Sequence, residues 1–276
     1  MAITRNPSPP SAPPSPPGDQ AAGLRRLFAG RRRHFIPLVA NPHVAFASVV
    51  LERLTTALAQ SGIPVLLVDA ADTSPAPRDV ALLDLGACVE PLDAHTHYLA
   101  ARGLPRDYVD TRGAATGFLT ALANAAPQAQ VIVVHGEASD LSRVFQRVDA
   151  RPVLIAGDRV ESVKHAYAAM KLFAQRAQLM TFDLLMCAPA GSRRARAVAT
   201  SMGSCADQYV GAMLSDWALI DPACDVTERP GEDLLHLLAR QLHLTPASTA
   251  LPPGMTSAFG PAASRTVAPA WQATSH

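Results

Sequence analysis

Short apolar runs alternate with stretches of helical period through most of this chain. The apolar runs are rich in Val, Ile and Leu without strict alternation, which is typical of strands covered on both faces. They predict strands at 34–40, 64–70, 130–135, 152–156, 181–187 and 217–220. The periodic stretches predict helices at 48–60, 114–125, 139–146, 160–178, 192–213 and 231–244. Their alternation predicts an α/β fold, a doubly wound and mainly parallel sheet with helices on both faces.

Proline and serine dominate both ends of the chain. Residues 1–18 and 246–276 have little to bury, so we expect them to be disordered, and a short amphipathic helix is expected at 19–30. At 276 residues and 49% apolar content, the chain is long enough for one α/β domain, which we place at 34–245.

Charge and cysteine usage narrow the class of protein. The formal net charge is +1 and the arginines are scattered, which argues against a nucleic-acid partner. Cys88, Cys187, Cys205 and Cys224 are widely spaced and beside apolar segments, which favours reduced core thiols over disulfides or a zinc site. With neither a signal-peptide pattern nor a run of about 18 apolar residues, we expect a cytoplasmic protein with at most peripheral membrane contact.

The first predicted strand-to-helix turn raises a chemical question. In open parallel sheets this turn is the usual phosphate site, and a phosphate loop there uses glycines, a lysine and a Ser or Thr for magnesium. The sequence "HFIPLVANPHVAFAS" supplies neither glycine nor lysine, and the two lysines of the chain, Lys164 and Lys171, fall on a later predicted helix. The turn is in the right place but lacks the residues that hold phosphate.

The following stretch, "SVVLERLTTALAQSGIPVLLVDAAD", resembles the MinD/ParA group of P-loop ATPases. The resemblance implies that Ser48 takes the magnesium position, Ala47 that of the phosphate lysine, and Pro42 that of the group's extra lysine. His43, Val44 and Phe46 then replace glycines, His135 replaces a strand-end aspartate, and an adenine-reading asparagine falls near Cys187, so that only Asp69 is retained. We therefore expect a pseudo-ATPase with a degenerate nucleotide site (Pro42, His43, Ala47, Ser48, Asp69, His135), no catalytic residue, no metal and no cofactor. The alternative is an active ATPase with an atypical loop that uses ATP and Mg.

A short segment before the domain, "DQAAGLRRLF", has Leu24, Leu27 and Phe28 on one helical face and Asp19 as a candidate N-cap. One interpretation is a helix that packs on the sheet. The pattern D-Q-A-x-G-L-R-x-L, however, is similar to the activator motif of the FlhG (FleN, YlxH) regulators of flagellar number.

That resemblance implies a partner and the residues that contact it. The helix would stimulate an FlhF-like GTPase, with Gln20 nearest the bound GTP beside Asp19, and with Leu24, Arg25 and Leu27 as the docking face. A glutamine suits the role because its amide can both donate to phosphate and accept from the attacking water. The resemblance also implies flagellar switch or export proteins as further partners and a homodimer. It further implies recruitment to the cell pole or flagellar base.

Three other groups of residues give weaker indications of function. The stretch 160–178, "VESVKHAYAAMKLFAQRAQ", is similar to the family's helix at the dimer and partner face, but its apolar positions also suit an ordinary core-facing helix. His95 and His97 have the spacing of two ligands on one strand face without an evident third. His135, Asp140 and Ser142 are the residue types of a catalytic triad, but no sequence motif of a nucleophile such as G-x-S-x-G accompanies them.

Overall fold

The computed structural model describes residues 33–225 and 228–242, in which eight strands form one sheet of order β3-β4-β2-β5-β1-β6-β7-β8. Every neighbouring pair is parallel except β3 with β4. The predicted fold class, a doubly wound and mainly parallel sheet, is confirmed. The expected terminal segments 1–18, 19–30 and 246–276 lie outside the described residues.

The six predicted strands are all present, and two more were not foreseen. The strands are β1 His34–Val39, β2 Val65–Asp69, β3 Glu90–Pro91, β4 Thr96–Ala100, β5 Val131–Gly136, β6 Val153–Gly157, β7 Thr181–Cys187 and β8 Met213–Ile220. Polar residues surround β4, and β3 has only two residues, so neither gives an apolar run for sequence analysis to detect.

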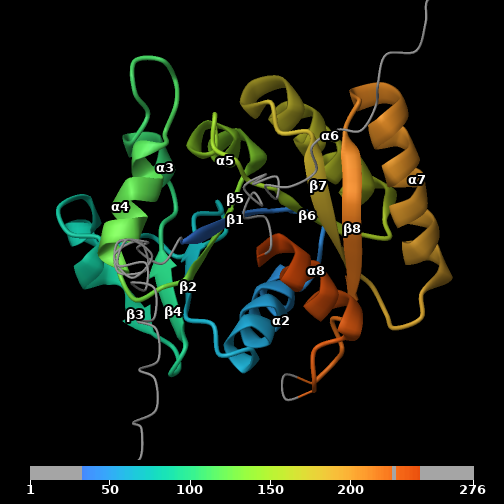
Figure 1. The fold of residues 1–276 in the computed structure, drawn as a ribbon, viewed down its shortest axis with the longest axis horizontal. Coiled ribbons are helices and arrows are strands. Elements are labelled where there is room, and N and C mark those ends of the chain that lie inside the picture. The colour runs from blue at the N-terminus through green and yellow to red at the C-terminus, as the bar shows by residue number, and fades with distance from the viewer. Residues whose placement is uncertain (1–32, 226–227, 243–276) are drawn as a thin grey trace, which may run out of the picture. The chain divides into compact units, whose positions relative to one another are not determined.

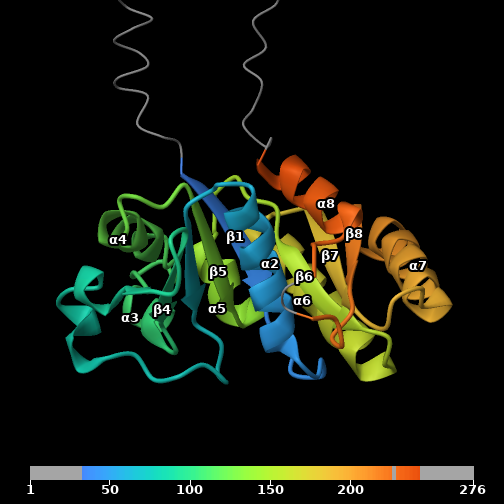
Figure 2. The same cartoon turned by 90° about the horizontal axis from the view of Figure 1, so that it is seen from below.

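The helices cover both faces of the sheet (Figures 1 and 2). They are α2 Ala47–Gln60, α3 Leu104–Asp107, α4 Gly117–Ala125, α5 Ala138–Val144, α6 Val160–Ala177, α7 Arg193–Val210 and α8 Glu232–Leu242, with short 3-10 turns at Asp79–Leu82 and Gly86–Cys88. One apolar cluster lies beneath α2 and α8, and a larger one beneath α4, α5, α6 and α7. The buried strands β1, β5, β6 and β7 supply side chains to both clusters, which explains why their apolar residues do not alternate with polar ones.

Two predicted helix ends were wrong, each for a local reason. The helix expected to run to Met213 ends at Val210, because Gly211 adopts the left-handed conformation (φ 67°) that closes many helices. Met213 instead opens β8, which is longer than predicted. The helix expected from Ala114 begins at Gly117, since Asp110 Oδ1 accepts from the Ala114 amide and holds the preceding residues in a turn.

The cysteines are free thiols in the structure. Cys88 and Cys187 are buried, and Cys205 and Cys224 are partly exposed, so the expectation of core thiols fits the first two better than the others. No helix in the described part of the chain is long and apolar enough to cross a bilayer.

Candidate functional site

The β1–α2 turn lies at the carboxyl edge of the sheet, at the centre of the strand order. β1 is flanked by β5 and β6, and its pairing extends one residue past the strand, where the Ala40 amide donates to the Gly136 carbonyl at 2.9 Å. The chain then turns over residues 41–46 and enters α2. Ala47 and Ser48 are the first two residues of that helix, which begins one residue before the predicted start at Ser48.

Asn41 organises this turn. The side chain is buried, and its Nδ2 lies 2.8 Å from the Ile155 carbonyl and 2.9 Å from the Ser162 carbonyl. Its Oδ1 accepts from the His43 amide, and its backbone carbonyl accepts from the Val44 amide, both at 3.1 Å. One side chain therefore fixes the turn to the end of β6 and the start of α6.

The rest of the turn is closed by packing. Val44 is buried in the apolar cluster beneath α2, and the Cys187 thiol lies 3.7 Å from the Ala45 carbonyl. Burial raises the pKa of Cys187 to about 11, so this thiol stays protonated and is available as a weak donor. The resemblance assigned an adenine-reading asparagine to the neighbourhood of Cys187, whose thiol here is directed at the turn.

Phe46 holds an unusual conformation for a bulky residue. Its φ of 63° and ψ of 34° are left-handed, and its side chain is 65% exposed. Glycine adopts this conformation at almost no cost, whereas other residues pay roughly 1–2 kcal/mol. The backbone at this point is one that suits glycine, although the residue is phenylalanine.

Asp69 and His135 are brought together at the ends of β2 and β5, where they are direct neighbours in the parallel register. His135 Nδ1 lies 2.8 Å from Asp69 Oδ1, and His135 is 3% exposed. Asp69 Oδ1 also lies 3.4 Å from the Ala71 amide, so it helps to cap the following turn. Within the described residues, His135 Nε2 is buried and has no hydrogen-bond partner.

His135, Asp140 and Ser142 do not form a catalytic triad. Asp140 Oδ2 binds Arg106 Nε at 3.0 Å, and Ser142 Oγ donates to the Ser139 carbonyl. Pro42 and His43 are exposed at the surface of the turn, and His43 packs edge-on against His165 of α6 at 5.8 Å between ring centroids. His95 lies just before β4, and the described part of the chain brings no three metal-ligating side chains together.

Sequence reasoning missed two residues at this edge. Asn41 gives no motif, because its role depends on acceptors more than 100 positions away. Arg106 bridges Asp140 and Asp72, the latter at 3.3 Å from Nη2, and so brings a cation to loops near the ends of β2 and β5. Two carboxylates neutralise it, which raises the pKa of Arg106. The unforeseen β4 and α3 place this arginine.

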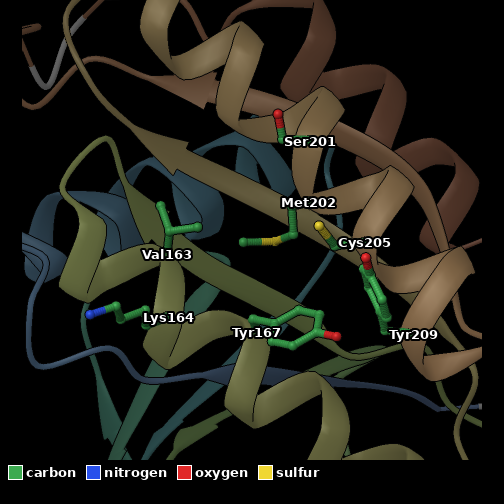
Figure 3. Close-up of a pocket in the computed structure, with 7 residues that line it drawn as sticks. All are labelled: Val163, Lys164, Tyr167, Ser201, Met202, Cys205 and Tyr209. Carbon is green, nitrogen blue, oxygen red and sulfur yellow. The ribbon is translucent and has the colours of Figure 1, made fainter.

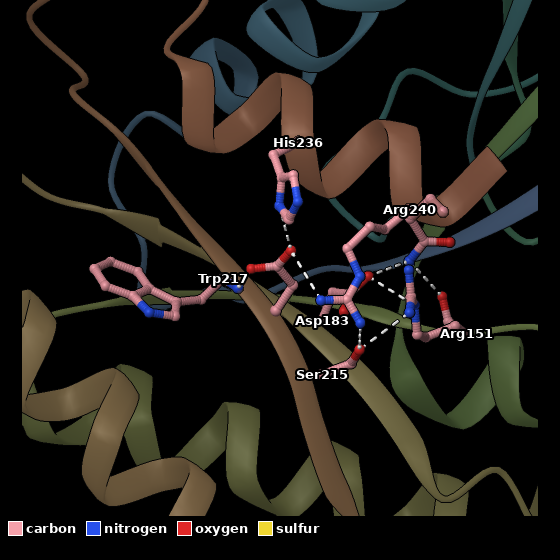
Figure 4. A network of polar contacts seen from close by, with 8 residues as sticks. Arg151, Asp183, Ser215, Trp217, His236 and Arg240 are labelled. Carbon is pink, nitrogen blue, oxygen red and sulfur yellow. Dashed lines mark hydrogen bonds and ion pairs between the residues drawn. The ribbon is translucent and has the colours of Figure 1, made fainter. Parts of the chain in front are cut away.

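A second polar cluster lies at the edge of the sheet where the parallel strands begin, opposite the β1–α2 turn (Figure 4). No sequence motif predicted this cluster. Asp183 of β7 is fully buried, with Oδ2 2.8 Å from Arg151 Nε and 2.7 Å from Gln241 Nε2 of α8. Burial raises the pKa of Asp183 to about 6, against the opposing effect of Arg151. Burial also lowers the pKa of His34, at the start of β1, and a hydrogen bond with Gln241 opposes that shift.

Around this buried pair, Arg151 Nη1 and Arg240 Nη2 each lie 3.1 Å from Ser215 Oγ. Asp216 binds His236 at 3.1 Å. The cluster connects β7, β8 and α8 with Arg151, which lies just before β6. It therefore stabilises the packing of these elements rather than forming a ligand-binding site.

Comparisons with known proteins identify the fold. No protein-family model and no curated protein matches the sequence. Among solved structures, a putative plasmid partition protein from Borrelia burgdorferi bound to AMPPNP is 10% identical with a TM-score of 0.53, over 75% of this chain and 97% of that one. Aquifex aeolicus MinD is 11% identical with a TM-score of 0.51, over 75% and 96%, and apo McdA from Cyanothece is 14% identical with 0.52, over 68% and 86%. The chain therefore has the fold of the MinD/ParA-type ATPases.

The residues of the turn do not fit a magnesium triphosphate held in the manner of a phosphate loop. Such a loop directs successive amides and a lysine at the anion. Here Pro42 has no N–H, the His43 and Val44 amides are bonded to Asn41, and Ala47 stands where the sequence resemblance expects the lysine. Ser48 is exposed at the start of α2 and would have to supply the metal contact without that charge.

Proposed function

We propose that this protein is a regulator of flagellar number and placement whose MinD-like domain is a pseudo-ATPase. The observation that carries the pseudo-ATPase part of the proposal is the turn at 41–46, where Asn41 holds two of the amides that a triphosphate would need. The Asp69–His135 pair adds to it, because a buried imidazole stands where the family resemblance expects a second carboxylate near magnesium.

An active ATPase is the second candidate, and one observation favours it. Phe46 keeps the left-handed backbone that a glycine of a phosphate loop can adopt, and a solved structure of this fold was obtained with AMPPNP. If binding of the nucleotide rearranged Asn41, the amides of His43 and Val44 would be released.

Titration with MgATP separates the two candidates. We expect no heat of binding at millimolar ATP by calorimetry, because no lysine and few free amides face the anion. Ser48→Ala provides the matched control. Binding in the micromolar range that requires magnesium and weakens in Ser48→Ala would establish the ATPase instead.

The effector part of the proposal rests on the segment 19–28, which lies outside the described residues. Its motif, D-Q-A-x-G-L-R-x-L, supports a role as the activator of an FlhF-like GTPase. The hydrolytic chemistry then belongs to the partner, and this chain contributes Gln20 as the group that orients the attacking water.

Multiple-turnover GTPase assays with purified FlhF test that role. We expect the full chain to stimulate hydrolysis and Gln20→Ala to lose roughly 10- to 100-fold of the stimulation, since misplacing a reacting group costs rates of that order. Arg26→Ala changes a variable position of the motif and should retain stimulation. Equal stimulation by the protein and by Gln20→Ala, or none by either, would contradict the proposal.

A further inference from the structure

A shallow apolar groove lies between α6 and α7, on the face of the sheet opposite α2 and α8 (Figure 3). Its volume is about 350 Å³. The side chains that line it are almost wholly apolar over their exposed surface, and they are Val163, Lys164, Tyr167, Ser201, Met202, Cys205 and Tyr209. Tyr209 is 68% exposed, so its ring extends the apolar surface of the groove toward solvent.

Basic residues are frequent on the two helices that form this groove. In sequence, α6 and α7 together carry six Lys or Arg and two acids, a net charge of +4, while the whole chain carries +1. Lys164 lines the groove, and Lys171 Nζ lies 6.0 Å from the centre of the Tyr167 ring. Arg194 precedes Ser201 by two helical turns and so belongs to the same stripe of α7. Of the two acids, Glu161 is paired with Lys164 at 3.1 Å.

We propose that the α6–α7 groove binds an acidic amphipathic helix of another protein. An apolar stripe at positions i, i+3, i+4 and i+7 would fill the groove, and flanking Glu or Asp would face Lys164, Lys171 and Arg194. Opposite charges around an apolar centre are the pattern by which such grooves select their ligands.

The charge pattern also decides against two other occupants. A second copy packed through the same face would bring its own basic helices against these, because a two-fold interface repeats each patch on both sides. The chain's amphipathic segment 19–28 carries Arg25 and Arg26 beside its apolar stripe, so it matches this rim poorly. An acidic helix from a different protein satisfies both the groove and its surroundings.

This inference does not depend on the proposed function. It concerns a face on the opposite side of the sheet from α2, and it holds whether or not the β1–α2 turn binds ATP.

A synthetic helix provides the probe. It has leucine at i, i+3, i+4 and i+7 and glutamate at most other positions, and a matched peptide carries lysine in place of every glutamate. By fluorescence anisotropy at low ionic strength, the full-length protein is expected to bind the glutamate peptide at least about 10-fold more tightly than the lysine peptide. The glutamate peptide is also expected to protect Cys205 from alkylation, since that thiol lines the groove and is only partly buried.

Variants locate the binding. Tyr209→Ser removes an exposed ring and should weaken binding at least about 5-fold without affecting the fold. The double change Lys164→Glu and Lys171→Glu should weaken it at least about 10-fold, and Arg112→Glu, an exposed change before α4, should leave it unaltered. No preference for the glutamate peptide, binding that ignores the groove variants, or a dimer of the protein that Tyr209→Ser dissociates would each overturn the proposal.

Discussion

Replacing Asp183 by alanine is expected to lower the free energy of unfolding by about 3–5 kcal/mol, because it leaves Arg151 as a buried charge without its partner. The side chain of Arg151 is 6% exposed and that of Asp183 is fully buried, so water cannot compensate the loss. Since a domain of this kind is stable by about 5–15 kcal/mol in total, the variant should unfold at much lower urea concentration. Urea unfolding followed by circular dichroism measures the difference.

Asp216→Ala is the matched control on the neighbouring strand. Its carboxylate is 18% exposed and pairs with the exposed His236, and surface pairs of this kind contribute about 0–1 kcal/mol. Equal losses in the two variants would show that burial of the Arg151–Asp183 pair has no special weight.

The same aspartate gives stability a dependence on pH. Its pKa of about 6 in the folded protein lies above the ordinary value of 3.8, so the folded state binds this proton more tightly than the unfolded chain. The resulting contribution is present in full below about pH 4 and is lost as pH rises through 6, about 3 kcal/mol in all. His34 acts in the opposite sense, because its lowered pKa favours the folded state above pH 6.5 and not below.

Asp183→Asn isolates the effect of the carboxylate. The stability of the unmodified protein minus that of Asp183→Asn should fall between pH 4 and 7, whereas contributions from His34 and other groups largely cancel in the difference. A difference that stays constant across this range would contradict the raised pKa.

The second large effect is expected at the turn. Asn41→Ala removes the buried donor to the Ile155 and Ser162 carbonyls and the partly buried acceptor for the His43 amide. Leaving buried polar groups unsatisfied costs about 1–3 kcal/mol each, part of which water recovers in the enlarged space, so a loss of about 2–4 kcal/mol is expected. Urea unfolding gives the total, and amide hydrogen exchange should become faster at His43 and Val44.

Asn124→Ala, an exposed change in α4, tests whether the loss is specific to the turn and should fall within about 0.5 kcal/mol. If Asn41→Ala were equally mild and the two amides remained protected, the turn would be held by packing of Val44 rather than by this side chain.

Local sequence predicted the central fold well and its edge poorly. β1, β5, β6 and β7 are buried on both faces, so each consists mainly of apolar residues that identify it without reference to the rest of the chain, although Asp183 interrupts the run of β7. β4 contains Thr96, His97 and Tyr98, and its strand character comes from pairing with β2 rather than from its own residues. No local pattern records such pairing.

The candidate site was likewise predictable only in part, because some of its residues are placed by local sequence and others by the pairing of distant elements. The register counted along the sequence placed Ser48 in the first turn of a helix and Asp69 at the end of a strand, and both placements are confirmed. The contact of His135 with Asp69 requires β2 and β5 to be neighbours, although β3, β4 and two helices separate them in sequence. Arg106 and Gln241 likewise acquire their roles only from the arrangement of distant elements.

The two ends of β1 contribute to different parts of the structure, and His34 marks the first of them. β1 begins among the polar contacts that fix α8 to the sheet, and Ala40, six residues after His34, leads into the closed turn. At about 3.3 Å per residue these ends lie roughly 20 Å apart. The start of β1 is thus held by the polar contacts at the amino edge of the sheet, and engineering of the opposite edge, even introduction of the glycines and lysine of a phosphate loop, would leave those contacts undisturbed.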